Sequence, residues 1–443
     1  MKILHVNTRD GIDGASRGVY TLHQGLRQVG IDSQMLVARK YSQDPTVHLP
    51  TATLLSRVLH ALRMWREKRP LAAYDVQGFF SPAAVSAHLQ PALRRLNPDI
   101  IHLHWVNHGF VRPEDLPTWN RPLVWTLRDM WPLTGGCHYS GRCDRYRGQC
   151  GQCPDLASHS DDDISRTQWQ RKQRVFRTTP IHFVTLSTWL ADCLRASPLS
   201  EGHPVHVIPN AINLDVFAPQ SKSQARVQLD LPADKKIILF GATTVTDENK
   251  GYKQLTQAVE QLATEQLSLE EPEKGKRPLH IATFGQGDTS ALDALPLSST
   301  HLGYIHDQRK LAALYSAADV MVVPSAYESF GKTAAEALAC GTPVVCFDST
   351  GLRDIVEHQE CGYRAQPFSS QDLAQGIAWV LADDTRHAAL AHRGRAKVTQ
   401  EFSLSRVSEQ YKTLYTQVIQ ARDIQGRGIQ GRGIQDSLGS TGS

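Results

Sequence analysis

The sequence lacks any run of about 18 consecutive apolar residues, the length that a membrane-spanning helix needs. Its formal net charge is only +4 over 443 residues, so it also lacks the concentrated positive charge typical of nucleic-acid-binding proteins. The first residues, Met1–Val6, carry no apolar segment of a secretion signal and have the pattern of a buried strand. We therefore expect a cytoplasmic protein with no nucleic acid among its partners.

What the sequence does contain is an alternation of short apolar runs and amphipathic stretches, which predicts parallel sheets covered by helices. The alternation stops in a turn-rich segment, Ile208–Pro219, and then restarts, and a length of 443 residues suits two α/β domains. The predicted strands are Ile3–Asn7, Ile100–His104, Pro122–Leu127, Ile181–Leu186 and Val205–Ile208, then Lys236–Phe240, Leu279–Phe284, Val320–Val323 and Val344–Phe347.

The strongest functional signal begins where the strand Val320–Val323 ends. Gly331 provides a turn, and a helix is predicted over Lys332–Cys340. Its N-terminus would lie at the carboxyl edge of the sheet, where free amides and the helix dipole attract a diphosphate. Glu328 precedes the helix and Glu336 lies inside it, and each carboxylate can accept hydrogen bonds from sugar hydroxyls. The alternative interpretation is an ordinary amphipathic helix with exposed acids.

In this strand–glycine–helix segment, Glu328 and Glu336 resemble the E-x7-E motif of family 4 glycosyltransferases, which have the GT-B fold and retain anomeric configuration. The resemblance implies two Rossmann-like domains that face each other across a cleft and bind a nucleotide-sugar donor. It implies that Glu328 contacts the donor sugar and Glu336 the ribose. It further implies that the loop contacts the sugar and phosphates through Ser329, Phe330, Gly331, Lys332 and Thr333.

The resemblance also implies a division of the chain. Residues 1–213 would form an acceptor domain, and residues 214–400 a donor domain. A helix in residues 401–421, with an apolar stripe that includes Val407, Tyr411 and Val418, would cross back to the first domain. Residues 422–443 repeat Gln, Gly, Arg and Ile and are predicted as a disordered tail.

Further motifs of the second domain resemble the same family. Phe240-Gly241, followed by Asn249-Lys250-Gly251, is similar to its phosphate-binding loop, in which Lys250 would neutralise the leaving diphosphate. Ala242 stands where that loop usually has an arginine, and a lone surface lysine is the alternative for Lys250. The segment around Tyr304 would lie near the nucleotide base, although an aromatic residue there can also serve packing alone.

The first domain carries a glycine-containing loop and a polar pair. Gly11, Gly14 and Gly18 follow the first strand without the Gly-x-Gly-x-x-Gly spacing of dinucleotide oxidoreductases. In the family this loop lies over the donor phosphates and borders the acceptor site, which would place Gly14 there; a plain turn is the alternative.

The segment Trp125–Tyr139 resembles the branch that includes colanic-acid-type exopolysaccharide glycosyltransferases. Relatives have His-Asp after this strand, and here Arg128 and Asp129 occupy those positions. A guanidinium is no general base near neutral pH, so Arg128 would bind a phosphate or an acidic sugar, or point away. Asp129 would steer the acceptor or hold a turn.

The resemblance implies a mechanism that needs no protein base. A retaining enzyme of this fold can let the leaving phosphate oxygen take the acceptor's proton, while the protein positions the substrates and stabilises charge. We find no convincing Asp-x-Asp metal motif and expect catalysis without a metal. The acceptor would be a saccharide or a lipid-linked saccharide in the synthesis of a cell-surface polysaccharide.

Two further features predict contacts outside the active site. Residues 137–153 contain Cys137, Cys143, Cys150 and Cys153, whose spacing favours a structural zinc ion over reduced thiols or disulfides. Ser56–Arg69 has the pattern of a basic amphipathic helix, which can lie on an anionic membrane surface or present an ordinary solvated face.

Two other functions remain open at this point. Some nucleotide-sugar epimerases share the GT-B fold, and product analysis with and without acceptor separates them from transferases. The departures at Arg128 and Ala242 also leave open a catalytically weak partner protein that binds sugar nucleotides.

Overall fold

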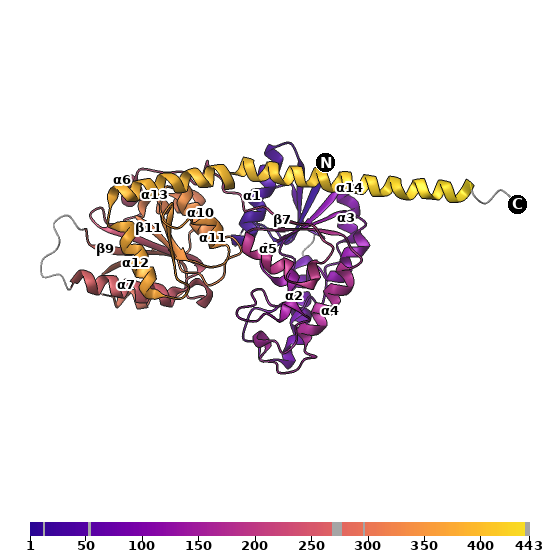
Figure 1. The fold of residues 1–443 in the computed structure, drawn as a ribbon, viewed down its shortest axis with the longest axis horizontal. Coiled ribbons are helices and arrows are strands. Elements are labelled where there is room, and N and C mark those ends of the chain that lie inside the picture. Colours follow the sequence, from indigo (N-terminus) through magenta and orange to yellow (C-terminus); the bar gives the residue numbers. More distant parts are fainter. Residues whose placement is uncertain (12–13, 52–54, 268–276, 296, 439–443) are drawn as a thin grey trace. The chain divides into compact units, whose positions relative to one another are not determined.

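We analysed a computed structural model of the chain, which describes residues 1–443 except 12–13, 52–54, 268–276, 296 and 439–443 (Figure 1). It contains two compact units. The first comprises Met1–Thr185, Ala191–Ile208 and Ser408–Ser443, and the second comprises Leu186–Leu190 and Pro209–Val407. Each unit is a parallel sheet between helices, which confirms the predicted α/β class with two Rossmann-like domains.

The first unit has a sheet whose seven strands are ordered β3-β2-β1-β4-β5-β6-β7 and are all parallel. The chain starts in the middle, winds outward to β3 and then returns past β1 to β4, so the carboxyl ends of β1 and β4 lie at the point where the winding reverses. The strands are β1 (Lys2–Arg9), β2 (Asp32–Arg39), β3 (Val47–His48), β4 (Ile100–Leu103), β5 (Leu123–Leu127), β6 (Ile181–Thr185) and β7 (Val205–Val207).

Helices and short 3-10 turns connect these strands. Helix α1 buries Val19, Leu22 and Leu26 at the spacing of one helix face. Asp163 caps the N-terminus of helix α4, because its carboxylate accepts hydrogen bonds from two amides of the first turn. The helices are α1 (Gly14–Gln28), α2 (Leu55–Lys68), α3 (Gln90–Leu96), α4 (Ile164–Phe176) and α5 (Thr188–Arg195), and the turns are η1 (Arg69–Ala73), η2 (Pro113–Trp119), η3 (Trp131–Leu133), η4 (Arg145–Arg147), η5 (Pro154–Leu156) and η6 (Pro198–Ser200).

The second unit has a parallel six-stranded sheet in the order β10-β9-β8-β11-β12-β13. Its strands are β8 (Lys236–Thr244), β9 (Leu279–Gln286), β10 (Ser298–His301), β11 (Val320–Val323), β12 (Val344–Phe347) and β13 (Gly362–Ala365). Its helices are α6 (Lys222–Gln228), η7 (Glu248–Lys250), α7 (Tyr252–Leu267), α8 (Ser290–Asp293), α9 (Gln308–Ala317), α10 (Lys332–Ala339), α11 (Leu352–Ile355), α12 (Ser370–Leu381), α13 (Asp384–Lys397) and the π-turn η8 (Val398–Phe402).

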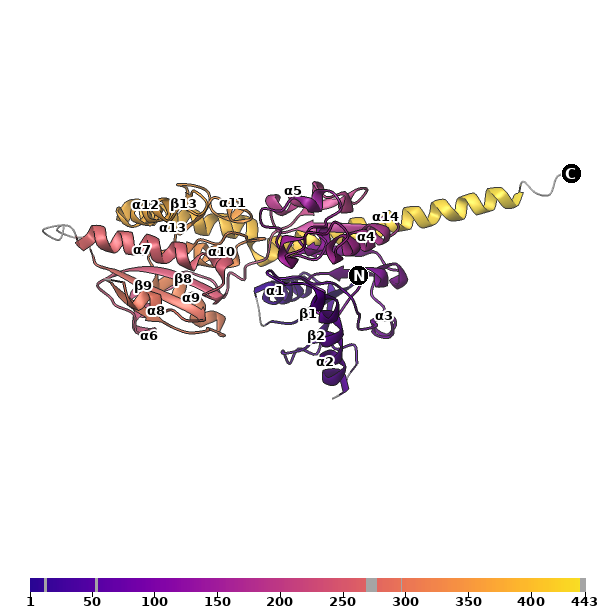
Figure 2. The same cartoon turned by 90° about the horizontal axis from the view of Figure 1, so that it is seen from below.

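Successive side chains of a strand point to opposite faces of the sheet, and this divides the core of the second unit into two layers. Ile237 and Leu239 pack with α9 and α10 on one face, whereas Ile238 and Phe240 pack with α7 and α12 on the other. Figure 2 shows α7 on one side of β8 and β9 and α9 on the opposite side. Strands buried on both faces explain why the sequence shows them as continuous apolar runs.

The C-terminal helix α14 spans Leu404–Leu438. Residues of the predicted apolar stripe are buried, and within the first unit Tyr411 and Tyr415 bond to Thr126 and His102 of the sheet. The helix continues to Leu438, where the sequence predicts a disordered tail from residue 422. Once a helix is nucleated, each added residue gains one hydrogen bond, which allows continuation through a polar segment. Residues 439–443 lie outside the described residues.

Membrane-spanning helices were also sought. Among the residues that the structure describes, no helix combines the length and the apolarity that crossing a membrane requires.

Candidate functional site

The N-terminus of α10 is the centre of the candidate donor site. Gly331 precedes the helix with φ = 98°, and a Cβ atom at this position would lie 2.6 Å from Leu352 Cδ2, so only glycine fits. No side chain caps the helix. The amides of its first turn have no intrahelical acceptor, and the dipole adds partial positive charge. This end can therefore bind an anion.

Glu336 lies one turn inside α10 and is buried. Its Oε2 accepts a hydrogen bond from the Tyr315 hydroxyl at 3.1 Å, and its Oε1 lies 3.2 Å from Lys332 Nζ. A buried carboxylate requires such partners. Each oxygen keeps further acceptor capacity, so Glu336 can still accept hydrogen bonds from a ligand.

Glu328 lies in the loop between β11 and α10 and meets a residue from another loop. Its Oε1 accepts a hydrogen bond from Lys250 Nζ at 2.6 Å. The backbone of Glu328 is fixed on both sides, because its amide donates to Thr350 Oγ1 at 3.0 Å and its carbonyl accepts from Gly351 at 2.9 Å. The structure thus brings together two residues that the sequence motifs select separately.

Lys250 reaches Glu328 because its loop is attached to the end of β11. The amide of Ala326 donates to the carbonyl of Asn249 at 2.9 Å, and Asn249 Nδ2 donates to the carbonyl of Tyr327 at 3.0 Å. Burial alone would lower the pKa of Lys250, but the Glu328 carboxylate outweighs it and the pKa is raised. Lys250 is therefore a permanent positive charge beside the N-terminus of α10.

The remaining predicted donor residues occupy less direct positions. Phe330 packs edge-on against Phe402 with ring centroids 5.4 Å apart, so its side chain belongs to the core and only its backbone is available. Gly241 lies against the Phe284 ring and has no room for a Cβ atom. Tyr304 is half-buried after β10. Lys332 and Thr333 are half-buried in the first turn of α10, and Ser329 is buried in the preceding loop.

In the first unit, Gly14 is the exposed first residue of α1 and follows the carboxyl end of β1, where parallel sheets bind ligands. Apart from its chain neighbours, no part of the described residues lies within 4 Å of the position that a Cβ atom would take. Residues 12–13 lie outside the described residues.

Asp129 follows β5 and is buried with both carboxylate oxygens in use. Its Oδ2 accepts from His138 Nδ1 at 2.6 Å and from Trp105 Nε1 at 2.9 Å. Its Oδ1 accepts from the Trp131 amide at 2.9 Å. His138 Nε2 in turn bonds to Ser81 Oγ at 2.9 Å. Asp129 is therefore the anchor of a hydrogen-bond network.

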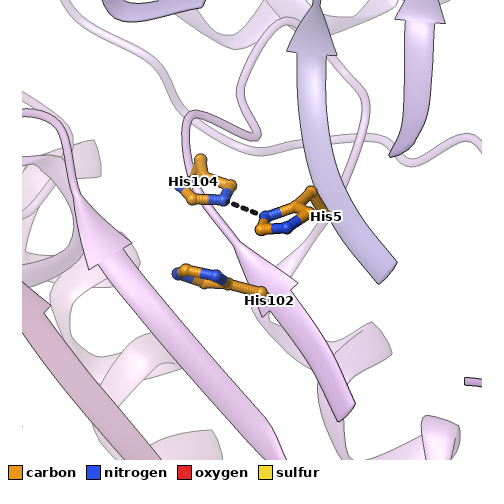
Figure 3. A group of neighbouring side chains, drawn as sticks. All are labelled: His5, His102 and His104. Carbon is orange, nitrogen blue, oxygen red and sulfur yellow. Dashed lines mark hydrogen bonds between the residues drawn. The ribbon is translucent and has the colours of Figure 1, made fainter. Parts of the chain in front are cut away.

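Arg128 turns into the domain and meets three buried histidines, His5, His102 and His104, which Figure 3 shows side by side on β1 and the end of β4. Arg128 Nη2 donates to His104 Nδ1 at 3.2 Å. Since guanidinium only donates, His104 must carry its proton on Nε2, which donates to His5 Nδ1 at 2.9 Å.

Ligand atoms of these three histidines lie within 4.8 Å of one another, a spacing that suits a metal. The network, however, already uses both nitrogens of His104 and of His102, whose partners are Tyr415 and Thr126 at 2.7 Å each. Burial, followed by neighbouring histidines and Arg128, lowers the pKa of all three well below the usual value. The adjacent Arg128 charge disfavours a cation, and we interpret the cluster as a polar core that holds α14 to the sheet.

The four predicted metal ligands line one small cavity, together with Phe80, Gly135, Gly136, Ser140, Tyr146 and Asp155 among other residues. Cys137, Cys143, Cys150 and Cys153 are all free thiols. Burial raises the pKa of Cys150 to about 11 and that of Cys153 to about 12. Tetrahedral zinc would hold such residues as thiolates, but among the described residues no three of these sulfur atoms lie within 4.8 Å of one another, so the structure lines one cavity with them without bringing them into a coordination set.

Helix α2 presents an unusual face to solvent. Its polar residue Glu67 is 3% exposed and accepts hydrogen bonds from the amides of Ala84 and Val85. The apolar residues Val58, Leu62 and Trp65 are 58%, 54% and 64% exposed. Their i, i+4, i+7 spacing makes one outward stripe.

The sequence could have revealed some of the residues it missed. His102 and His104 alternate along a predicted strand and must share one face of the sheet, opposite Leu103. His138 belongs to the quoted segment Trp125–Tyr139, but its bond to Asp129 depends on the path of an irregular loop. No sequence pattern predicts that contact.

Comparisons with known proteins bear on both units. Residues 12–216 match the family model described as Glycosyltransferase Family 4, and residues 221–397 match the model described as Glycosyl transferases group 1. The chain is 29% identical over 338 residues to D-inositol 3-phosphate glycosyltransferase of Xylanimonas cellulosilytica, with 73% of each chain covered.

Two further proteins match nearly the whole length. The chain is 24% identical over 430 residues to the putative colanic acid biosynthesis glycosyl transferase WcaC of Escherichia coli K12, with 89% of this chain and 97% of that one covered. The crystal structure of Anabaena HepE in complex with UDP-glucose has a TM-score of 0.62 at 18% identity, with 94% of this chain and 100% of that one covered. The latter match shows the shared fold.

Proposed function

We propose that this chain, which is a glycosyltransferase of the GT-B fold with family 4 and group 1 domains, moves a sugar from a nucleotide-sugar to a saccharide or lipid-linked saccharide and retains its anomeric configuration. The observation that carries the proposal is the Lys250–Glu328 pair, 2.6 Å apart, beside the uncapped N-terminus of α10. Lys250 and the helix N-terminus supply positive charge for a diphosphate, and Glu328 beside them supplies a carboxylate that can accept hydrogen bonds from sugar hydroxyls.

Donor binding would use the two carboxylates differently. Glu336, buried and bonded to Tyr315 and Lys332, accepts from the ribose hydroxyls. Glu328 keeps Oε2 for a hydroxyl of the donor sugar, while Lys250 and the first-turn amides of α10 bind the diphosphate. HepE was crystallised with UDP-glucose, which supports a nucleotide-sugar donor and makes UDP-sugars the first to test.

The chemical step would proceed on one face of the sugar. The acceptor oxygen forms a bond to the anomeric carbon as the bond to the leaving phosphate breaks, and the acceptor's proton passes to that phosphate oxygen. Lys250 and the helix N-terminus stabilise the charge that develops on the diphosphate. Asp129 has both oxygens engaged, so it would position neighbouring rings and would not take the proton. No metal is required.

The acceptor would belong to the synthesis of an exopolysaccharide or another cell-surface polysaccharide. The WcaC relative, named for colanic acid biosynthesis, supports this assignment. The test is to incubate the purified protein with a panel of nucleotide-sugars, with and without saccharide acceptors. Transfer of the donor sugar to an acceptor supports the proposal. Epimerised donor formed without acceptor would instead identify an epimerase, and binding without turnover a partner protein.

The same proposal places the enzyme at the cytoplasmic face of a membrane through α2. The stripe Val58, Leu62 and Trp65 would enter the interface, and the exposed Arg66 and Lys68 would meet anionic lipid headgroups. We expect cosedimentation with vesicles that contain phosphatidylglycerol, weaker binding to phosphatidylcholine vesicles, and loss of binding in Leu62→Glu. The control is Val227→Glu, which changes a residue that is 81% exposed in the other unit. Equal binding by Leu62→Glu and wild type contradicts this placement.

The four cysteines would hold one structural zinc ion. A set of four thiolates leaves no open coordination position, so the ion would fix the loop and take no part in catalysis. Metal analysis of protein purified without added metal should give about one equivalent per chain. Cys150→Ser should lower this content and the melting temperature, whereas Cys193→Ser should change neither. Metal content far below one equivalent with four titratable thiols contradicts the site.

A further inference from the structure

Four rings gather in the first unit where β4 ends. Phe79 stacks on His138 with ring centroids 4.0 Å apart and an interplanar angle of 18°. Trp105 lies nearly parallel to Phe79 at 6.2 Å, and His108 meets Trp105 edge-on at 4.7 Å. Phe79 remains 55% exposed, so part of this stack is open to solvent. Exposed aromatic clusters on a fixed support are typical of binding sites.

Hydrogen bonds fix the ring cluster, which comprises Phe79, Trp105, His108 and His138. Asp129 Oδ2 accepts from His138 Nδ1 and from Trp105 Nε1, and so orients both rings. Ser81 Oγ bonds to the other nitrogen of His138 at 2.9 Å. The imidazole beneath Phe79 is therefore held at both nitrogens, and the surface of the cluster is preorganised.

The ring cluster stands at the ligand-binding edge of the sheet. Trp105 follows the end of β4 by two residues, and Asp129 follows the end of β5 by two residues. The amide of Thr8, near the end of β1, donates to the carbonyl of Trp105 at 2.8 Å. The carboxyl ends of β1 and β4 are where the winding of the sheet reverses, which is the usual ligand position in such folds.

Basic side chains lie near the ring cluster. Arg9 ends β1, pairs in register with Arg39 at the end of β2, and is close enough for its charge to act on His108. A Cβ atom at Gly109 would lie 3.5 Å from Cβ of Arg63, so α2 runs beside the turn that carries His108. Arginine is suited to phosphate oxygens because its planar fork donates two parallel hydrogen bonds.

The electrostatics around His108 agree with this arrangement. Burial first, and then the charges of Arg9, of two histidines and of Lys68, lower the pKa of His108 to about 4. Asp10 and Glu67 are buried and accept backbone amides, Asp129 accepts from His138 and Trp105, and the half-buried Asp155 lies against Gly78. The side chains that act on His108 are positive or neutral, so the part of the ring cluster beside His108 favours an anion.

We propose that Phe79 and Trp105 form the subsite for the acceptor sugar, and that Arg9, Arg39 and Arg63 bind a phosphate or diphosphate carried by that acceptor. The C–H face of a sugar ring packs on an aromatic face, and the guanidinium groups bind the anionic oxygens. This inference rests on the proposed transferase function and adds the chemical class of its acceptor, a glycosyl phosphate.

The test measures binding of two matched compounds by titration calorimetry with UDP present at saturation. One is a hexose joined to a short alkyl chain through a diphosphate, and the other has the same hexose and chain joined by a neutral ether; glucose, galactose and N-acetylglucosamine versions are used. We expect the diphosphate compound to bind about tenfold more tightly in wild type. Phe79→Ala should weaken both compounds about tenfold, and Arg63→Ala should remove most of the difference between them.

Matched controls lie in regions remote in sequence from the subsite. Phe368→Ala removes a phenyl ring that is 56% exposed in the second unit, and Arg195→Ala removes an exposed arginine. Neither should change acceptor binding. Inorganic diphosphate should bind much more weakly than the glycosyl compound and show no dependence on Phe79.

Several outcomes overturn the inference: no binding of either compound to wild type, unchanged binding by Phe79→Ala, equal affinities for the two compounds, or inorganic diphosphate binding as tightly as the glycosyl compound. Titration of UDP alone separates this inference from the proposed function. Loss of UDP binding and of nucleotide-sugar turnover in wild type counts against the transferase itself, whereas intact UDP binding with a failed acceptor test counts against the subsite only.

Discussion

The acidic residues of the two units are held in different ways. Glu328 of the second unit is half-buried and bonds through Oε1 to the ammonium group of Lys250. Asp129 of the first unit is buried and receives hydrogen bonds from two ring nitrogens and a backbone amide. Glu328 therefore keeps an oxygen that can accept a hydrogen bond from a ligand, whereas both oxygens of Asp129 are used to stabilise the fold. Substituting Glu328 should lower turnover, and substituting Asp129 should lower stability.

Glu328→Gln should produce the largest effect on turnover. The amide keeps the shape but loses the charge that bonds to Lys250 and to the donor sugar, so we expect kcat to fall about 100- to 1000-fold. The melting temperature should change less than in Asp129→Asn, because the glutamine side-chain oxygen can still accept the hydrogen bond from Lys250 Nζ. Steady-state kinetics and thermal unfolding are the two measurements, and Glu260→Gln on the exposed face of α7 is the control. Normal kcat with collapsed nucleotide binding contradicts the assignment.

Asp129→Asn should reverse that pattern. Asparagine offers a single acceptor oxygen where two ring N–H donors and an amide converge, which leaves a buried donor without a partner. We expect a loss of about 2–4 kcal/mol in the free energy of unfolding. Chemical denaturation measures it, and Asp192→Asn on an exposed helix is the control. A stable Asp129→Asn with strongly reduced kcat would show that Asp129 acts in chemistry and would remove the contrast with Glu328.

Glu336→Gln sharpens the comparison within the proposed donor site. Glu336 is more buried than Glu328 and would contact the ribose, so its loss should weaken binding of the free nucleoside diphosphate by about 1–3 kcal/mol. Glu328→Gln should leave that affinity near wild type, because its contact is to the sugar. Calorimetric titration of UDP into both variants tests the pair of expectations. Unchanged affinity in Glu336→Gln refutes the ribose role.

The same contrast explains what the sequence can predict. The proposed donor site is encoded mostly by one local segment: a strand, a loop with Glu328, a glycine that must adopt positive φ, and a helix that contains Glu336. The strands that the sequence predicts are buried on both faces and show as apolar runs, such as Val320–Val323. The sequence does not predict β2, because Asp32–Arg39 has only a short apolar centre, Met35–Val37, and forms a strand by pairing with β1.

The proposed acceptor subsite depends on contacts between distant segments. Phe79, Trp105 and His138 come from three loops, and nothing in their spacing indicates that the rings stack. His102 and Tyr415 are separated by 313 residues and meet only because α14 packs on the first sheet. Hydrogen bonds of this kind are set by tertiary structure, so the sequence identifies the residue types but not their partners.

The smallest effect concerns the buried histidines of the first unit. Their pKa values are lowered chiefly by burial, so in the folded protein they stay neutral where the unfolded chain binds protons, below its ordinary pKa of about 6.5. Their contribution to stability is therefore present above about pH 6.5 and is lost as the pH falls below it. For one such histidine the loss of stability between pH 7 and pH 6 is about 0.7 kcal/mol.

His102→Gln tests this expectation, because glutamine can still bond to Thr126 and Tyr415 but cannot take up a proton. Between pH 7 and pH 6, the unfolding free energy of this variant should fall by about 0.7 kcal/mol less than that of wild type. Urea denaturation of both proteins at pH 7 and pH 6 measures the difference, and His159→Gln, which changes a histidine outside the cluster, should behave as wild type. Equal pH dependence in His102→Gln and wild type would show that His102 binds its proton equally well in the folded and unfolded protein.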